Sequence, residues 1–186
     1  MLEVKTYISK DPRIYRKKIE ELGIHCSTKN LEQYPEIFYY DLEKLKKGEH
    51  YYEKDLEEFI ETAMYIKYDN QILIGLGVKG LELLETVMHS LVMFFQNDFH
   101  SVKSQLGIDY DEISINNCGE DAEIFVYEEP TNKIFYQGSA PKKLLLNGVL
   151  NSASDYYKTL WELKKMNDHE YERLMIKINE YRKLYR

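Results

Sequence analysis

Cysteine is scarce in this chain of 186 residues, which has only Cys26 and Cys118. Two cysteines are too few for a disulfide framework, so both are expected as free thiols in a reducing compartment. No apolar run approaches the ~18 residues that a transmembrane helix needs. The first residues, MLEVK, also lack the basic and apolar regions of a signal peptide. These features predict a cytoplasmic protein without a membrane partner.

Recognisable catalytic groups are missing as well. The five histidines are scattered along the chain, and no Gly-x-Ser-x-Gly nucleophile elbow occurs. Glu85 and His89 are four residues apart, whereas a di-iron helix carries Glu-x-x-His. We therefore expect no metal site, no cofactor and no catalytic residues, and the chain is predicted not to be an enzyme.

Positive charge is almost absent from the segment 106–137. Its only base is Lys133, and its eight acids are Asp109, Asp111, Glu112, Glu120, Asp121, Glu123, Glu128 and Glu129. This segment alone matches the net charge of the whole chain, −7. Nucleic acid is a poor partner, because phosphate binding needs clustered Lys and Arg. The charge favours a basic protein partner; the alternative is a solvated acidic face that only keeps the protein soluble.

The stretch ILIGLGVKGLELLE, residues 72–85, contains a literal Gly-x-Gly-x-x-Gly formed by Gly75, Gly77 and Gly80. A dinucleotide-binding loop needs a parallel βαβ unit whose second strand ends in an acid. Here the preceding strand is expected in a hairpin, and no buried strand follows the helix. We interpret the glycines as structural residues that turn the chain with positive φ. An enzyme that binds a nucleotide or S-adenosylmethionine through Gly75–Gly80 is the alternative.

Short elements are predicted in the first 74 residues. A strand over 2–8 precedes a helix that Asp11 caps, Pro12 begins and Gly23 ends. The later elements are a loop over 24–35, a segment 35–47 that suits either helix or strand, a short helix through Leu56, Phe59, Ile60 and Ala63, and a hairpin over 64–74 around Asp69-Asn70.

The second half begins with the strongest helical pattern of the chain, from Gly80 to about Asn97, whose wide apolar face predicts a buried central helix. Phe99, Val102 and Leu106 would prolong it to Gly107. Three strands are expected over 111–116, 122–128 and 133–137. Two helices should follow, one capped by Ser152–Asp155 and one starting at Asp168.

These elements predict a single α+β domain over 1–186. An antiparallel sheet, made of the hairpin and the meander, packs on the long central helix, and residues 151–186 form a C-terminal helical pair. The strands of the meander would present acids and aromatics together, as protein interfaces often do. The predicted partner-binding residues are Asp109, Tyr110, Asp111, Glu112, Glu120, Asp121, Glu123, Tyr127, Glu128 and Glu129. The row Glu53, Glu57, Glu61 is a second acidic candidate.

Two stretches add a resemblance to a known family. IFVYEEPTNKIFYQG, residues 124–138, places an acidic turn between two strands, and LNSASDYYKTLWEL, residues 150–163, places Asn-x-x-Ser before an aromatic helix. With the start of the meander at Gly119, residues 108–165 resemble the C-terminal half of the SUKH superfamily, the immunity proteins of bacterial toxin systems. The N-terminal half does not show that pattern. The resemblance implies an α+β protein that binds and neutralises a cognate toxin without catalysis. A basic, nuclease-like toxin would suit the charge. A phage-encoded inhibitor of a host nuclease or defence system is the alternative.

Overall fold

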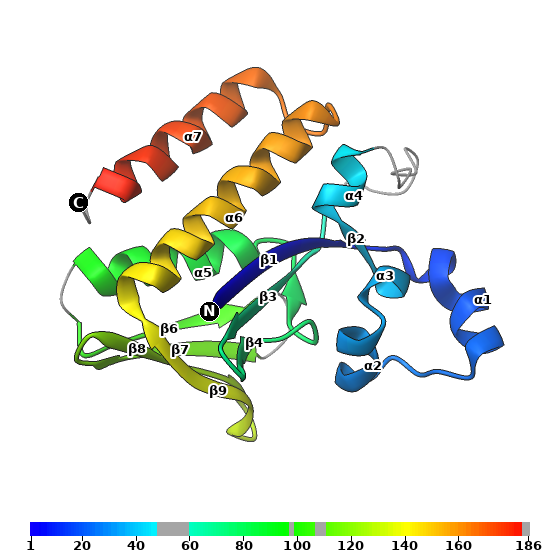
Figure 1. Ribbon diagram of the computed structural model, residues 1–186, viewed down its shortest axis with the longest axis horizontal. Helices are drawn as coiled ribbons and strands as arrows, with labels where there is room; N and C mark the ends of the chain where they lie inside the picture. The colour runs from blue at the N-terminus through cyan, green and yellow to red at the C-terminus, as the bar shows by residue number, and fades with distance from the viewer. Residues whose placement is uncertain (48–59, 97–98, 107–110, 184–186) are drawn as a thin grey trace.

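The computed structural model describes residues 1–47, 60–96, 99–106 and 111–183. They form two antiparallel sheets, a group of short N-terminal helices, a central helix and a C-terminal helical pair (Figure 1). The predicted α+β class, with a hairpin, a meander and a long helix, is confirmed, but the hairpin and the meander belong to two sheets and not to one. Within the described ranges, no helix has both the length and the apolar character needed to cross a membrane.

The first sheet, sheet A, has the strand order β2-β1-β3-β4, and β5 also pairs with β3. Its strands are β1 (Leu2–Ser9), β2 (Tyr39–Asp41), β3 (Thr62–Tyr68), β4 (Gln71–Ile74) and β5 (Lys79–Gly80). The predicted hairpin is confirmed, because β3 and β4 pair antiparallel around a tight turn. Asp69 in this turn has a φ of 51°, which Asp tolerates better than most residues.

The second sheet, sheet B, is an antiparallel meander with the order β6-β7-β8-β9. Its strands are β6 (Ser101–Leu106), β7 (Asp111–Cys118), β8 (Asp121–Glu128) and β9 (Lys133–Pro141). The three predicted strands are confirmed, but the predicted prolongation of the central helix to Gly107 is wrong. Val102, Ser104 and Leu106 are less exposed than the residues between them. Their spacing therefore follows the two-residue period of a strand.

Four short helices lie between β1 and β3: α1 (Pro12–Leu22), α2 (Thr28–Gln33), α3 (Pro35–Phe38) and α4 (Leu42–Lys46). The helix α1 begins and ends as predicted, with the Asp11 carboxylate accepting from the Arg13 N–H and Gly23 at a φ of 62°. The predicted loop over 24–35 is wrong, because the Ser27 side chain caps α2. The ambiguous segment 35–47 is α3, β2 and α4 in succession.

The predicted helix through Leu56 and Phe59 falls mostly outside the described residues. Ala63, the last residue of the predicted helix, lies in β3, so a helix does not extend to this residue. Of the acidic row, Glu53 and Glu57 also lie outside the described residues. The remaining member, Glu61, accepts a hydrogen bond of 2.7 Å from Lys79 Nζ.

The central helix α5 (Leu83–Gln96) is buried over most of its circumference, as predicted. Leu83 and Leu91 have no exposed surface, and Met88 and Val92 are almost fully buried. The helix packs against β6, β3 and α6, so its side chains join the two sheets and the C-terminal helices in one main hydrophobic core. A smaller cluster around Phe38 attaches the N-terminal helices to sheet A.

The C-terminal pair is α6 (Lys142–Glu162) and α7 (Asp168–Lys183). The helix α7 begins at Asp168 as predicted, but α6 begins at Lys142, before the expected boundary at residue 151. The predicted capping box at Ser152–Asp155 is wrong, because Ser152 is buried in the middle of α6. Its Oγ lies 2.8 Å from Thr6 Oγ1 of β1. The Asn-x-x-Ser stretch of the SUKH resemblance therefore does not stand at the start of a helix.

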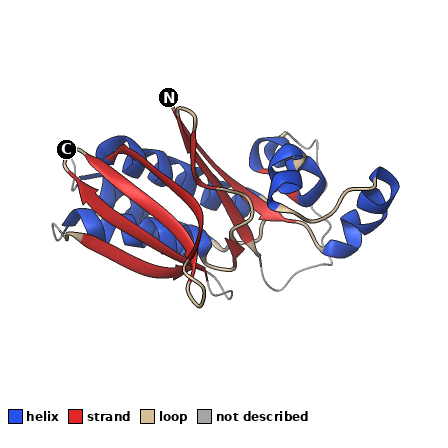
Figure 2. Cartoon of the chain, turned by 90° about the horizontal axis from the view of Figure 1, so that it is seen from below, coloured by secondary structure: helices blue, strands red, loops and turns tan. Residues whose placement is uncertain are grey.

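One side of sheet B faces helices α5 and α6, and no helix of the described residues lies in front of the other side (Figure 2). Along β8, Ala122, Ile124 and Val126 are buried, whereas Glu123 and Phe125 are partly exposed. This alternation confirms the prediction that Glu123 and Phe125 share one face of the strand. We call the uncovered side the outer face of sheet B.

Candidate functional site

The outer face of sheet B, with the turns at the two ends of β8, brings together many of the residues predicted to bind a partner. Strand register and alternation place the predicted residues Glu112, Asp121, Glu123 and Tyr127 on it, and the flanking turns add Glu120 and Glu129. We call this surface the acidic face. Glu120 and Glu129 are exposed turn residues at opposite ends of β8, so the acids are spread along the strand.

The other predicted residues do not lie on the acidic face. Asp111 and Glu128 pair with each other across β7 and β8, and strand alternation places both on the inner side, at the end of the sheet. The Glu128 carboxylate accepts a hydrogen bond from Thr131 Oγ1. Asp109 and Tyr110 lie outside the described residues.

A basic residue that the sequence analysis missed, Lys103, lies on the same face. Its Nζ is 5.6 Å from the centroid of the Tyr127 ring, and the Tyr127 hydroxyl donates to Glu112 Oε2. The hydrogen bond with Tyr127 raises the pKa of Lys103. Burial, followed by the hydrogen bond to Glu112, raises the pKa of Tyr127. The three side chains form a connected polar group that spans β6, β7 and β8.

Apolar side chains lie at the β8–β9 end of this surface. Ile134 is 52% exposed and Phe135 is 39% exposed, and Phe125 lies partly exposed in the neighbouring strand. The Nζ of Lys133 is 5.4 Å from the centroid of the Phe135 ring. Exposed apolar side chains bordered by charge are typical of a protein interface. The abundance of aromatics in KIFY indicated a strand, but only the sheet shows which of them reach the surface.

Charge is distributed unequally between the two sides of the molecule. The described residues of 101–141 include seven acids and two bases, whereas residues 142–183 include nine bases and six acids. The first set forms sheet B, and the second forms α6 and α7, which lie at the opposite side of the molecule in Figure 1. The negative charge of the chain is therefore concentrated on the side of sheet B.

The glycine-rich stretch joins β4 to β5, and both strands pair antiparallel with β3. It therefore lacks the parallel βαβ setting of a dinucleotide-binding loop. The prediction that its glycines have positive φ is wrong, because Gly23 and Gly119 are the described glycines with that conformation. The structural role comes instead from close packing.

Tyr136 of β9 occupies the space beside these glycines. A Cβ atom on Gly75 would lie 2.3 Å from Tyr136 Oη, and one on Gly77 would lie 3.4 Å from it. The Tyr136 hydroxyl donates to Glu32 Oε1 of α2 at 3.1 Å. Burial, then the charge of Glu32, raises the pKa of Tyr136. The loop is thus a junction between α2, sheet A and sheet B.

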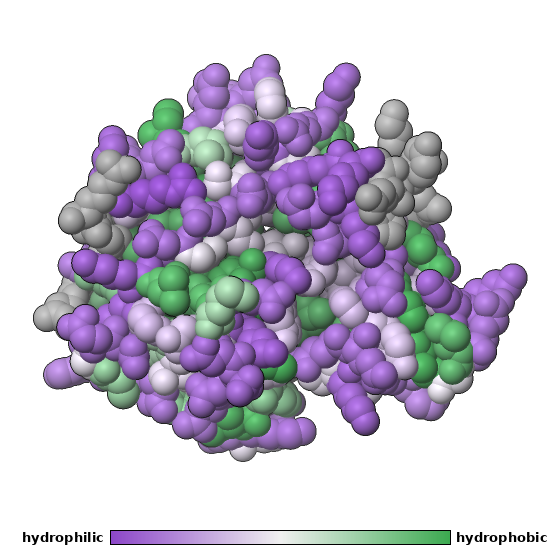
Figure 3. All heavy atoms as spheres, viewed as in Figure 1, coloured by the Kyte–Doolittle hydropathy of each residue, from purple (hydrophilic) through white to green (hydrophobic). Residues whose placement is uncertain are grey.

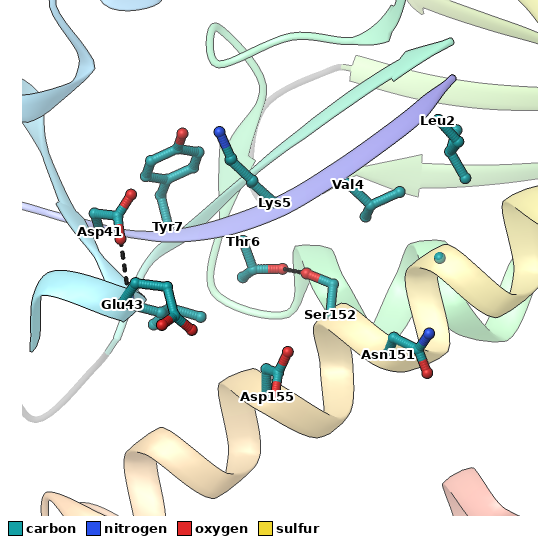
Figure 4. A pocket seen from close by; sticks show the side chains of 12 residues that line it. Leu2, Val4, Lys5, Thr6, Tyr7, Asp41, Glu43, Asn151, Ser152 and Asp155 are labelled. Atoms are coloured by element: carbon teal, nitrogen blue, oxygen red, sulfur yellow. Dashed lines mark hydrogen bonds between the residues drawn. The ribbon is translucent and has the colours of Figure 1, made fainter. Parts of the chain in front are cut away.

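A pocket of about 280 Å³ lies between β1, the start of α4 and the middle of α6. Figure 3 shows a hollow between α6 and β1, and Figure 4 shows Thr6 pointing toward α6 while Lys5 and Tyr7 point away. The close approach depends on Gly148, where a Cβ atom would lie 2.7 Å from Leu2 Cδ2. Sequence reasoning did not find this pocket, since it joins segments far apart in the chain.

The acids around this pocket already have partners. The Asp41 carboxylate accepts from the N–H of Glu43 at 2.8 Å and so caps α4. The Nζ of Lys46 lies 3.2 Å from Glu43 Oε1 and 3.7 Å from Asp155 Oδ1. Thr6 and Ser152 bond to each other. These polar groups thus bond to one another within the chain. The pocket is therefore a weaker candidate site than the acidic face.

The spacing of Glu85 and His89 does not build a metal site. Glu85 Oε1 accepts a hydrogen bond of 3.1 Å from Tyr157 Oη of α6, and His89 is exposed. In the part of the chain that the structure describes, no group of three or more His, Cys, Asp or Glu side chains is placed to hold a metal ion. Cys26 and Cys118 are both exposed and free.

Comparisons with known proteins add no relative. No family model matches the chain, and neither a curated protein nor a solved structure is significantly similar to it.

Proposed function

We propose that this chain is a non-catalytic binding protein whose acidic face docks a basic protein. The observation that carries the proposal is the uncovered outer face of sheet B, where Glu112, Asp121 and Glu123 surround partly exposed aromatic side chains. An antiparallel sheet can leave one face to solvent, and this face has the charge and the aromatic content of an interface.

Charge complementarity is the physical basis for the choice of partner. An acidic patch raises the association rate of a basic protein by steering, and it disfavours acidic competitors. The aromatic side chains Phe125 and Tyr127 would supply buried contact area once the partner is seated. The basic helices α6 and α7 lie on the other side, so the protein would present a defined negative face to an approaching partner.

The resemblance of residues 108–165 to the SUKH superfamily suggests what the partner is. In that case the chain would be an immunity protein, and the partner a basic, nuclease-like toxin that it neutralises in the bacterial cytoplasm. A phage-encoded inhibitor of a host nuclease would use the same surface physics. The identity of the captured protein distinguishes the two.

The proposal is tested by affinity capture from the source cell with three forms of the chain. They are the wild type, the variant Glu120→Lys/Glu123→Lys on the acidic face, and the control Glu172→Lys/Glu180→Lys. Both variants reverse two partly or fully exposed acids, so they change the net charge equally. The control residues lie on α7, far from the acidic face.

The wild type and the α7 control should retain the same basic protein, and the acidic-face variant should retain several-fold less of it. Identification of the retained protein as a nuclease or toxin would support the immunity function. Equal retention by all three forms, or retention of an acidic protein, would contradict docking through this face.

A further inference from the structure

The strand β6 is one edge of sheet B. Within the described residues it pairs only with β7, on one side. The opposite edge strand, β9, runs against β4 of sheet A. An edge strand presents unpaired N–H and C=O groups, which form a template for another extended chain.

The register identifies which groups point outward. The Asn117 N–H donates to the His100 carbonyl, and this pair continues the register of Ser101 with Asn116. In an antiparallel ladder, alternate residues direct both backbone groups toward the same neighbour. The even-numbered residues of β6 therefore bond to β7. The backbone groups of Ser101, Lys103 and Gln105 point to the free edge.

The usual protection of an edge strand is weak here. Natural edges carry charged side chains, proline or bulges that prevent further pairing. β6 contains no proline and a single charged residue, Lys103. The Lys103 side chain crosses β7 beside the small side chain of Ser114, its register partner. Its ammonium group lies over the ring of Tyr127 in β8. Its charge is thus directed away from the edge.

We propose that two copies of this chain pair antiparallel through β6, with Lys103 of one copy opposite Gln105 of the other. These residues are the ones whose outward N–H and C=O groups can exchange hydrogen bonds across the new ladder. The sheets of the two copies then continue into one another. This pairing is separate from the docking of a basic protein, and either can hold without the other.

Side-chain pairing selects this register. It places Val102 beside Leu106 of the second copy on the inner side, which joins two apolar residues. A register shifted to place Lys103 opposite Lys103 would put like charges directly across from each other, which destabilises a sheet. It would also pair Val102 with Ser104. The chosen register avoids both costs.

Charge is compatible with a second copy as the occupant. A twofold axis perpendicular to the sheet keeps both outer faces on the same side. The strand β6 carries no acid, and the Lys103 ammonium group of each copy lies over Tyr127, which bonds to Glu112 of the same copy. No acid therefore lies directly opposite an acid across the new ladder.

The test uses the full chain in sedimentation velocity and light scattering over a range of concentrations. The wild type should shift from the mass of one chain to the mass of two as concentration rises. Lys103→Pro removes the outward N–H together with the ammonium group and should remain a single chain, and it should fold, since proline is tolerated at edges where the N–H faces outward. Lys103→Ala keeps the N–H and is the matched control, which should still form dimers.

Amide hydrogen exchange of the wild type provides a second readout that does not depend on a variant folding. The amides of Lys103 and Gln105 should exchange more slowly as concentration rises, whereas those of Val102 and Ser104 should be protected at every concentration. A wild-type mass of one chain throughout, or dimers that persist in a folded Lys103→Pro variant, would overturn the proposal. Concentration-independent exchange at Lys103 and Gln105 would overturn it as well.

Discussion

Gly138 lies where β9 runs against β4, and the two sheets meet there because this residue has no side chain. A Cβ atom would lie 2.5 Å from Leu73 Cδ2 and 3.0 Å from Gln71 Oε1, and Leu73 is fully buried. We expect Gly138→Ala to lower the free energy of unfolding by about 1–3 kcal/mol, the range for overpacking. Urea denaturation measures the change.

Gly77→Ala is the control for that substitution. Its Cβ atom would meet the Thr28 hydroxyl at 3.2 Å, and Gly77 is exposed, so Thr28 can move at little cost. The expected loss of stability is smaller than for Gly138→Ala. Equal effects would show that the contact between β4 and β9 is not tightly packed.

Buried and partly buried tyrosines give the protein a specific sensitivity to alkaline pH. Burial raises the pKa of Tyr15 to about 12, and burial, followed by the charge of Glu85, raises the pKa of Tyr156 and of Tyr157. The unfolded phenols ionise near ~10. The folded state therefore binds these protons more tightly, and their contribution to stability is complete below about pH 10 and is lost as the pH rises through the folded values.

We expect the free energy of unfolding to decrease steadily above about pH 10. Chemical denaturation at several alkaline pH values measures it, together with the ultraviolet absorbance of the phenolates. Tyr157→Phe removes one of these groups and should make the decrease shallower. Ionisation of all tyrosines near pH ~10 with the fold intact would contradict the assigned burial.

At the residue level, local roles such as helix caps could be predicted from the sequence, whereas contacts between distant residues could not. It located the caps Asp11 and Gly23, because their signals are local. The packing role of Gly75 could not be predicted from local signals, because Tyr136, which packs against it, is distant in the chain. Lys103 was missed since Phe99, Val102 and Leu106 also fit a helical spacing.

Among the elements, α5 is the one on which both sheets and α6 converge. Leu91 has no exposed surface, whereas Met93 on the same helix is 36% exposed. We expect Leu91→Ala to lower the free energy of unfolding by about 2–5 kcal/mol, the range for large-to-small core substitutions. Met93→Ala should cost much less. A thermal midpoint unchanged by Leu91→Ala would mean that α5 is not packed as described.

The attachment of α6 to β1 depends on a buried pair of hydroxyl groups. Thr6 Oγ1 and Ser152 Oγ lie 2.8 Å apart, and each residue is almost fully buried. Ser152→Ala leaves the Thr6 hydroxyl without its partner, so we expect a loss of about 1–3 kcal/mol in the free energy of unfolding.

A double-mutant cycle separates the hydrogen bond from the packing. Thr6→Val combined with Ser152→Ala removes both polar groups, and it should cost less than the sum of the two single changes. Strict additivity in denaturation experiments would mean that the two hydroxyls do not interact.

The type of each long element was predictable, but several boundaries were not. The stretch before Ser152 contains Gly148, and glycine usually weakens a helix. The start of α6 at Lys142 could therefore not be predicted from the sequence. Gly148 is present because α6 crosses β1 closely. Short helices such as α2 carry few periodic residues, and tertiary packing decides whether they form.

On the scale of the whole molecule, sheet B places acidic residues on one side and α6 and α7 place bases on the other. The acidic segment was visible in the sequence, because it depends on composition alone. Its division into an acidic face, two end turns and an inner pair could not be predicted without the strand register. The proposed docking and the proposed pairing through β6 use different parts of this sheet, the outer face and the edge.

The most direct test of docking through the acidic face is the association rate with the captured partner, measured by stopped flow at low and high salt. Glu120→Lys/Glu123→Lys should slow association at low salt, whereas Glu172→Lys/Glu180→Lys should not. The difference should shrink at high salt, because screening removes the steering. Equal association rates for the two variants at low salt would contradict docking through the acidic face.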